Sequence, residues 1–280
     1  MADDPRVIPA RPDLAALHLK DVVEADVYAS PTQMRVSVPL APLTGSRDAE
    51  GEMISQLIFG ESFTVYENDN GWVWGQTALD GYVGYIPEAC MMEAHGEATH
   101  RITAVQALVY PEPDFRARPI GALPFASRVS TGGRSAPFVE LDVGGWVGEA
   151  TVKPISDKAP MWVATAERFK GAPYLWGGRS AAGFDCSGLV QIALHSANVA
   201  CPRDSDQQMA SLGRSTSQAA LRRGDLVFWK GHVGIMTSPE KILHANLHHM
   251  EVAEETLAAA VDRIGKKEFG DILDVKRITA

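Results

Sequence analysis

Cys186 is the residue of this chain best suited to covalent chemistry. It lies in the run Gly183-Phe184-Asp185-Cys186-Ser187-Gly188, and apolar residues follow it at helical spacing from Leu189 to Ala197. This pattern places the cysteine in the first turn of an amphipathic helix. There, free backbone N–H groups and the helix dipole favour a thiolate by about 0.3–1 kcal/mol and lower the thiol pKa. We therefore expect a nucleophile at Cys186 whose backbone N–H donates to an oxyanion. The alternative is an inert buried cysteine.

Two histidines supply a base for this thiol. The segment 231–236 and the segment 240–244 are typical of strands, and the turn Thr237-Ser238-Pro239 separates them. The midpoint between His232 and His244 is Ser238, so a hairpin centred on the turn would place the two imidazoles directly opposite each other. One ring can then accept the thiol proton while the other orients it, as in a nucleophile, base and orienter triad. The alternative is a pair of strand histidines with local hydrogen bonds.

Other cysteines and histidines carry weaker signals. Cys90 and Cys201 have no base nearby in the sequence and are interpreted as structural, and His195 as a surface or core residue. A metal site formed by His244, His248 and His249 would lack a matching carboxylate or cysteine at ligand spacing. We therefore expect no metal and no cofactor.

Composition limits the class of protein. With 280 residues, 45% hydrophobic residues and 22% charged residues, the chain is long enough for two or three ordinary globular domains. The net charge of −9 argues against nucleic-acid and anionic membrane partners. Residues 1–6 lack a secretory pattern, and an odd number of cysteines without a CxxC motif fits a reducing compartment. We expect a cytoplasmic protein, and a monomer, although the sequence does not determine the oligomeric state.

The pattern along the chain predicts four parts. Residues 1–30 form a leader with one short helix, roughly from Asp13 to Asp26, after several prolines. Short strands and turns then fill residues 31–95, and a weaker copy fills residues 96–156. Both copies end in a Gly-aromatic-Val-Gly run, which favours two small tandem β-barrels. Residues 157–280 change to helices followed by an antiparallel sheet, so the fold class is α+β.

Five motifs in order make the last part similar to the NlpC/P60 family of papain-like cysteine peptidases that act on cell walls. They are Pro173-Tyr174-Leu175-Trp176-Gly177-Gly178, Phe184-Asp185-Cys186-Ser187-Gly188-Leu189-Val190, Pro202-Arg203-Asp204-Ser205, Gly224-Asp225-Leu226-Val227-Phe228 and Gly231-His232-Val233-Gly234-Ile235. The resemblance implies Cys186 as nucleophile, His232 as base and His244 as the orienting residue. The two barrels resemble bacterial SH3-like (SH3b) domains.

The combination resembles the γ-D-glutamyl-L-diamino acid endopeptidases, which cut murein peptides that have a free N-terminal L-Ala. This resemblance implies cell-wall peptide recycling and a murein tripeptide or tetrapeptide as substrate. It implies substrate-binding roles for Tyr174, Asp185, Ser187, Ser205, Tyr82 and Glu61. Other roles remain open: Asp185 as a helix cap, Ser205 or Asp204 as a helix start, and at least one of Tyr82 and Tyr85 as barrel core.

Two functions from other classes compete with this one. The SH3-like repeats would suit a cell-wall binding protein with little turnover, although the cysteine, both histidines and their flanks are intact. A papain-like scaffold would also suit an amidase or acyltransferase that passes its acyl group to another acceptor. The sequence does not determine the preferred diamino acid, or whether the second barrel contributes to the site.

Overall fold

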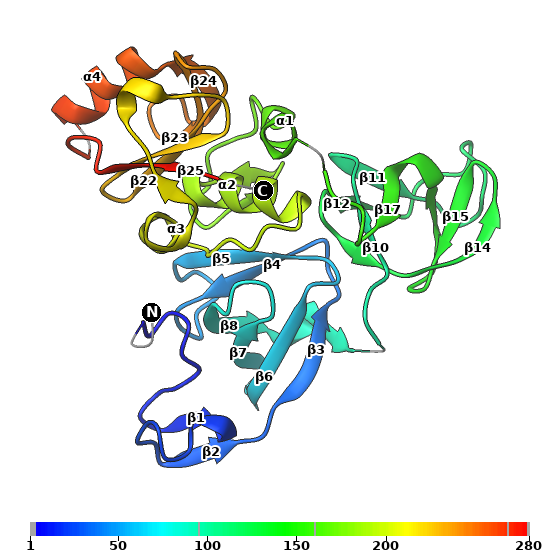
Figure 1. The fold of residues 1–280 in the computed structure, drawn as a ribbon. Coiled ribbons are helices and arrows are strands. Elements are labelled where there is room, and N and C mark those ends of the chain that lie inside the picture. The colour runs from blue at the N-terminus through cyan, green and yellow to red at the C-terminus, as the bar shows by residue number, and fades with distance from the viewer. Residues whose placement is uncertain (1–3, 95, 160, 268, 279–280) are drawn as a thin grey trace. The chain divides into compact units, whose positions relative to one another are not determined.

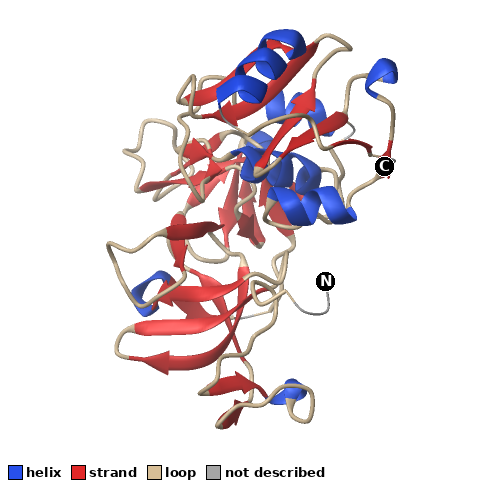
Figure 2. Ribbon diagram, turned by 90° about the vertical axis from the view of Figure 1, so that its left-hand side faces the viewer, coloured by secondary structure: helices blue, strands red, loops and turns tan. Residues whose placement is uncertain are grey.

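β-Structure makes up the first part of the chain, and a mixed α+β structure makes up the rest (Figures 1 and 2). The computed structural model describes residues 4–94, 96–159, 161–267 and 269–278. It divides into two compact units, Met1–Ile155 and Ser156–Ala280, which are described separately below.

The first barrel is a seven-stranded antiparallel sheet with the strand order β5-β4-β8-β7-β6-β3-β9. Its strands are β3 (Thr32–Val36), β4 (Leu40–Thr44), β5 (Met53–Ile58), β6 (Ser62–Asp69), β7 (Trp72–Thr77), β8 (Val83–Pro87) and β9 (Met91–Glu93). Alternate apolar side chains on these strands point inwards, and Val36, Leu43, Phe63, Val73 and Ile86 are fully buried in one core. The turn between β6 and β7 uses Asn70 and Gly71, both at positive φ.

A second β-structure follows, built from shorter strands in three small sheets. They are β10 (His100–Ile102), β11 (Gln106–Val109), β12 (Gly121–Pro124), β13 (Arg128–Val129), β14 (Thr131–Ser135), β15 (Phe138–Leu141), β16 (Trp146–Gly148) and β17 (Val152–Pro154). It has its own apolar core, around Ile102, Val129 and Val147. Both copies end alike, because a 3₁₀ turn (η2, Glu88–Cys90; η3, Glu149–Thr151) joins the last two strands of each. The repeated glycine-aromatic runs lie just before these turns, in or next to β8 and β16.

The predicted leader helix is wrong. The segment instead forms β1 (Leu14–Ala16), a 3₁₀ turn η1 (Leu17–Leu19) and β2 (Val27–Ala29), and the two strands pair in parallel. All three residues of β1 are buried, so the apolar run forms a buried strand instead of one face of a helix. In addition, Asp21 has a φ of 74°, which an α-helix does not accommodate.

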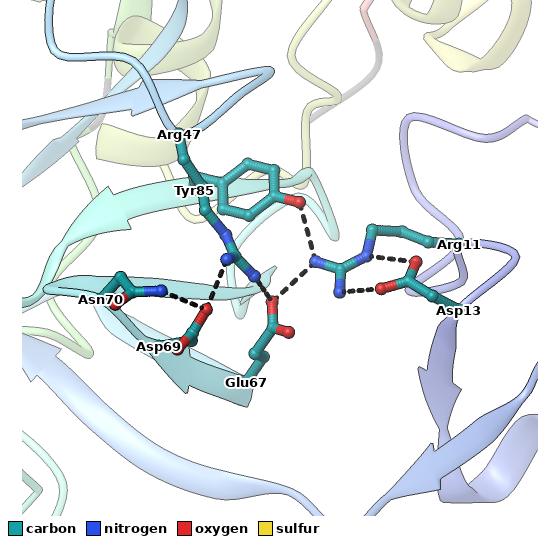
Figure 3. Close-up of polar contacts among 7 residues, drawn as sticks. All are labelled: Arg11, Asp13, Arg47, Glu67, Asp69, Asn70 and Tyr85. Carbon is teal, nitrogen blue, oxygen red and sulfur yellow. Dashed lines mark hydrogen bonds and ion pairs between the residues drawn. The ribbon is translucent and has the colours of Figure 1, made fainter.

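Arg11 anchors the leader to the first barrel (Figure 3). Its Nη1 donates to Glu67 Oε2 at 2.9 Å and to Tyr85 Oη at 2.8 Å, and its guanidinium lies 4.4 Å from the centre of the Trp74 ring. Arg47 reaches the same Glu67 carboxylate from the barrel side. The leader is therefore held by tertiary contacts rather than by helical hydrogen bonds.

The second unit combines a six-stranded antiparallel sheet with helices, in the strand order β20-β25-β21-β22-β23-β24. The strands are β20 (Arg214–Ser215), β21 (Asp225–Trp229), β22 (His232–Met236), β23 (Lys241–Asn246), β24 (Glu251–Thr256) and β25 (Asp274–Arg277). A short hairpin of β18 (Arg179–Ser180) and β19 (Gly183–Phe184) precedes them. The helices are α1 (Trp162–Glu167), α2 (Cys186–Ser196), α3 (Ser205–Ser211) and α4 (Leu257–Lys267), with a 3₁₀ turn η4 (Gln218–Ala220).

Helices pack on this sheet through apolar side chains. Ala260 and Ile264 of α4 share a core with Val227, Met236 and Ile242 of the sheet. Helix α2 contacts β22, β23 and α1, and nearly all of its residues are buried. Among the described residues, no helix combines the length and apolarity needed to cross a bilayer.

Candidate functional site

Cys186 is the first residue of α2, as the sequence predicted. Asp185 is the N-cap, and its Oδ1 accepts a hydrogen bond from the Gly188 N–H at 2.7 Å. The helix start is tightly packed, because a Cβ on Gly188 would lie 2.2 Å from the carbonyl oxygen of Gly178. The Asp185 cap and this close backbone approach fix Cys186 at the N-terminal end of α2.

The Asp185 carboxylate belongs to a buried network that also contains Arg203 and Ser187. Arg203 Nη1 and Nη2 donate to Asp185 Oδ1 and Oδ2 at 3.1 and 2.5 Å, and Nη1 also donates to Ser187 Oγ at 3.0 Å. The Gly177 N–H donates to Asp185 Oδ2 at 3.0 Å. The carboxylate therefore ties the loop before the hairpin, the start of α2 and the segment before α3 together.

The Cys186 thiol does not have the lowered pKa that its position at a helix start predicted. Burial, and then the negative charge of Asp185, raise its pKa to about 12. Hydrogen bonds from the backbone N–H groups of Val233 and Ser187, together with the charge of Arg203, oppose this shift without cancelling it. The free protein therefore holds a neutral thiol at pH 7, and nucleophilic attack needs a base.

His232 and His244 are brought together, but in a different register from the predicted one. The hairpin pairs Ile235 with Leu243 and Met236 with Ile242, because Thr237 N–H bonds to the Lys241 carbonyl and the loop is centred one residue later than expected. This register moves His244 from the position opposite His232 to a diagonal one. The rings still meet: His232 Nε2 lies 2.8 Å from His244 Nδ1, with the ring centres 5.1 Å apart.

Gly234 makes room for this arrangement. A Cβ at this position would lie 3.4 Å from His244 Cβ and 2.5 Å from Ile242 Cδ1. The glycine thus sits across from His244, where the predicted register would have placed His232.

The histidine pair continues to Glu255 on β24 and Arg263 on α4. His244 Nε2 lies 2.9 Å from Glu255 Oε1, and Arg263 Nη2 donates to the same oxygen at 2.5 Å. Burial lowers the pKa of His232 well below its usual 6.5, and it also lowers the pKa of His244. Burial pushes the pKa of Glu255 up, but the hydrogen bonds from His244 and Arg263 outweigh it and lower that pKa to about 2. At pH 7 both rings are therefore neutral and Glu255 is a carboxylate.

Besides Asp185 and Ser187, the predicted substrate-binding residues Tyr174 and Ser205 lie in the same unit as Cys186. Tyr174 is half-buried, and burial, followed by the negative charges of ionised Cys186 and Asp185, raises the pKa of its phenol. Ser205 is the first residue of α3, which begins with a capping box between Asp204 and Gln207. Gln208 of the same helix donates to the Ser187 carbonyl at 3.0 Å.

Glu61 and Tyr82 belong to the first unit. Glu61 Oε2 accepts a hydrogen bond from the Ile58 N–H at 3.0 Å, and Tyr82 is buried in the core of the first barrel. The alternative reading of Tyr82 as a core residue therefore agrees with its position.

The structure adds Arg203 and Glu255 to the residues that the sequence singled out. Arg203 is part of the Pro202-Arg203-Asp204-Ser205 motif, so its place in that motif could have indicated a role at the site. No pattern in the sequence indicated Glu255, because Glu254 precedes it and the sequence does not say which of the two carboxylates faces His244. As for the alternative metal site, no group of three or more metal-binding side chains was found in the described ranges.

Together these contacts can support acyl transfer. A neutral thiol lies at a helix start, and its sulfur accepts a hydrogen bond from the N–H of Val233, the residue after His232. A neutral, buried imidazole oriented by a second imidazole is suited to take up a thiol proton.

Comparison with known families matches two parts of the chain. Residues 171–263 match the NlpC/P60 family, and residues 45–90 match the bacterial dipeptidyl-peptidase SH3 domain. Both regions carry the motifs described above.

Curated relatives include dipeptidyl-peptidases. The chain is 26% identical over 223 residues to a gamma-D-glutamyl-L-lysine dipeptidyl-peptidase of Bacillus cereus, covering 68% of this chain and 66% of the relative. It is 34% identical over 111 residues to the Bacillus subtilis protein of that name, covering 36% and 37%. It is 26% identical over 243 residues to dipeptidyl-peptidase 6 of Lysinibacillus sphaericus, covering 78% and 89%. The chain thus spans less than two thirds of the length of the first two.

A solved structure shares the fold. The crystal structure of an NlpC/P60 family protein from Bacillus cereus superimposes with a TM-score of 0.76 at 18% identity, covering 89% of this chain and all of the other. This likeness confirms the predicted α+β fold with an SH3-like β region before it. Residues 171–263 of the chain therefore form an NlpC/P60 domain, and an SH3 domain of the bacterial dipeptidyl-peptidase type precedes it in the sequence.

Proposed function

We propose that the chain is a cysteine endopeptidase that hydrolyses the γ-D-glutamyl-L-diamino acid bond of murein peptides with a free N-terminal L-Ala. The observation that carries the proposal is the contact of 2.8 Å between His232 Nε2 and His244 Nδ1, in the domain where Cys186 starts α2. The names of the relatives, gamma-D-glutamyl-L-lysine dipeptidyl-peptidases, support this substrate class.

The reaction follows from the protonation states. His232 takes the proton of the Cys186 thiol as the sulfur attacks the γ-carbonyl carbon of D-Glu, and a C–S bond forms. The backbone N–H of Cys186 donates to the oxyanion. The imidazolium then gives the proton to the leaving amine of the diamino acid as the C–N bond breaks. Water, deprotonated by His232, hydrolyses the thioester and restores the thiol. No step requires a cofactor.

The substrate contacts form part of the proposal. Tyr174, Ser187 and Ser205 would contact the L-Ala and D-Glu groups beside the nucleophile. Asp185 would favour the free ammonium of L-Ala, while its bonds to Arg203 hold the carboxylate in place.

The free amine also suggests where the reaction occurs. In intact peptidoglycan the L-Ala nitrogen forms an amide bond, so a free amine arises only after the stem peptide has been released. We therefore place the enzyme in the recycling of soluble murein peptides, and in the cytoplasm. Cell fractionation followed by immunoblotting tests the compartment.

The decisive experiment uses defined tripeptides, L-Ala-γ-D-Glu-L-Lys and L-Ala-γ-D-Glu-meso-diaminopimelate. Mass spectrometry should find L-Ala-D-Glu and the free diamino acid with the wild-type chain. Cys186→Ala should abolish turnover, whereas Cys201→Ala should retain it.

An N-acetylated copy of each tripeptide tests the amine requirement. Equal cleavage of free and acetylated peptides would show that the N-terminal amine is not recognised. Absence of cleavage of both free tripeptides would refute the proposed substrate class.

A further inference from the structure

Glu255 and Arg263 extend the histidine pair by two more residues. We infer that the Glu255 carboxylate is a positioning residue that sets the tautomers of His244 and His232, so that His232 presents Nδ1 as the base. This inference rests on the proposed function for the role of His232, but the tautomers themselves are a property of the free protein.

The contacts form one continuous chain across three strands and a helix. His232 on β22 bonds to His244 on β23 at 2.8 Å, and His244 bonds to Glu255 on β24 at 2.9 Å. Arg263 on α4 donates to Glu255 at 2.5 Å. His232 is 4% exposed and His244 is fully buried, so water cannot easily replace these partners.

The tautomers follow from counting protons. An ionised carboxylate only accepts hydrogen bonds, so His244 must carry its proton on Nε2, which faces Glu255. A neutral ring has one proton, so His244 Nδ1 is an acceptor. His232 Nε2, which meets that acceptor, must then be protonated. The lone pair of His232 is thereby placed on Nδ1.

Without the carboxylate this order is lost. If His244 carried its proton on Nδ1, His232 Nε2 would have to accept, and His232 would hold its own proton on Nδ1. A ring protonated there cannot take the thiol proton of Cys186. Glu255 thus selects the reactive tautomer of His232 through its hydrogen bond with His244.

The charged and titratable groups around the two histidines shift the histidine pKa values in opposite directions. Glu255 favours the protonated form of both histidines, whereas Arg263 disfavours it, and His249 acts on His244 in the same sense as Arg263. The charge of a protonated His244 also lowers the pKa of His232. Phe269 stacks on His232 with the ring centres 5.4 Å apart, and Trp229 lies on another side of that ring.

Glu255→Gln keeps the shape of the side chain and allows either tautomer of His244. We expect kcat to fall at least about tenfold with KM changed less than about twofold, a smaller loss than the roughly 10⁴-fold one seen when a carboxylate that touches the base is neutralised. Long-range ¹H–¹⁵N NMR should show His232 protonated on Nε2 in the wild type and partly on Nδ1 in this variant. Glu255→Asp, which keeps the carboxylate, should restore the wild-type tautomer.

Glu254→Gln is the matched control. This neighbour on β24 pairs with Lys170 and accepts a hydrogen bond from Thr237, so its loss should leave kcat and the NMR tautomers unchanged.

Arg263→Gln adds a second test, because Arg263 and Glu255 shift the histidine pKa values in opposite directions. The low-pH side of the kcat profile should move to lower pH in Glu255→Gln and to higher pH in Arg263→Gln. A loss of packing alone would not produce these opposite shifts.

Several outcomes would overturn the inference: His232 protonated on Nδ1 in the wild type, an unchanged kcat in Glu255→Gln, or a loss of kcat without a change of tautomer. Shifts of the low-pH side of the kcat profile in the same direction in the two variants would also overturn it. If the wild type cleaves neither tripeptide, the proposed function fails, while the NMR measurement on the free protein still decides the tautomer.

Discussion

Arg203 Nη2 lies 2.5 Å from Asp185 Oδ2, and both side chains are buried, Arg203 to within 1% exposure. The guanidinium meets the carboxylate with two nitrogens, in the forked geometry that makes such pairs specific. Asp185 caps the helix that begins with Cys186. The position of the nucleophile therefore depends on an arginine 18 residues away from the cap.

Removal of this arginine should destabilise the protein strongly. Arg203→Met leaves a buried carboxylate without its counter-charge, which typically costs about 3–5 kcal/mol. We expect that loss in the free energy of unfolding, measured by urea denaturation.

Arg134→Met serves as the control for this substitution. Arg134 pairs with Glu149 at 2.8 Å, but the two side chains are 67% and 42% exposed, so the change should stay within about 1 kcal/mol. If both variants lost the same small amount, the buried pair would not be an important source of stability.

Gly234→Ala should displace the His244 ring. The new methyl group would lie 2.5 Å from Ile242 Cδ1 in a closely packed core, and relief of this clash should cost about 1–3 kcal/mol and lower kcat. Denaturation and steady-state kinetics measure the two effects.

A second substitution tests the cause. Ile242→Ala removes both Cδ1 and Cγ1, which would lie 2.5 and 2.7 Å from the new methyl group, so Gly234→Ala should cost less stability in the Ile242→Ala background than in the wild type. Gly121→Ala, where nothing lies within 4 Å of the new Cβ, should be near neutral. Fully additive losses in the double variant would show that the Ile242 contact is not the source.

The reactivity of Cys186 should depend steeply on pH. Because burial raises the thiol pKa to about 12, the thiolate fraction of the free protein should rise about tenfold per pH unit through the neutral and mildly alkaline range. Alkylation by iodoacetamide, followed site by site with peptide mass spectrometry, measures this slope.

Cys90, half-buried and with a pKa also raised by burial, is the internal reference. A rate at Cys186 that is already constant between pH 6 and 8 would mean that the thiolate exists before substrate binds. Because burial lowers the pKa of His232, its neutral form, which acts as the base, should persist well below pH 6.5.

Local chemistry is what the sequence by itself determined. The cap at Asp185 and the helical spacing after Cys186 involve residues a few positions apart, so the helix start could be predicted, as could two strands with a turn between His232 and His244. The ordered motifs led to the family for the same reason, because each is a continuous stretch of chain.

Tertiary structure decided what depends on distant residues. A strand has a period of two, so a register shifted by two residues keeps both histidines on one face, and only the loop bonding of Thr237 to Lys241 fixed the diagonal contact. Strand pairing overrode the helix expected in the leader. The raised thiol pKa reflects burial, and the choice of Glu255 over Glu254 reflects which side chain of β24 faces His244. Burial and long-range pairing arise only when the chain is folded, so the sequence could identify the reacting residues but not their protonation states.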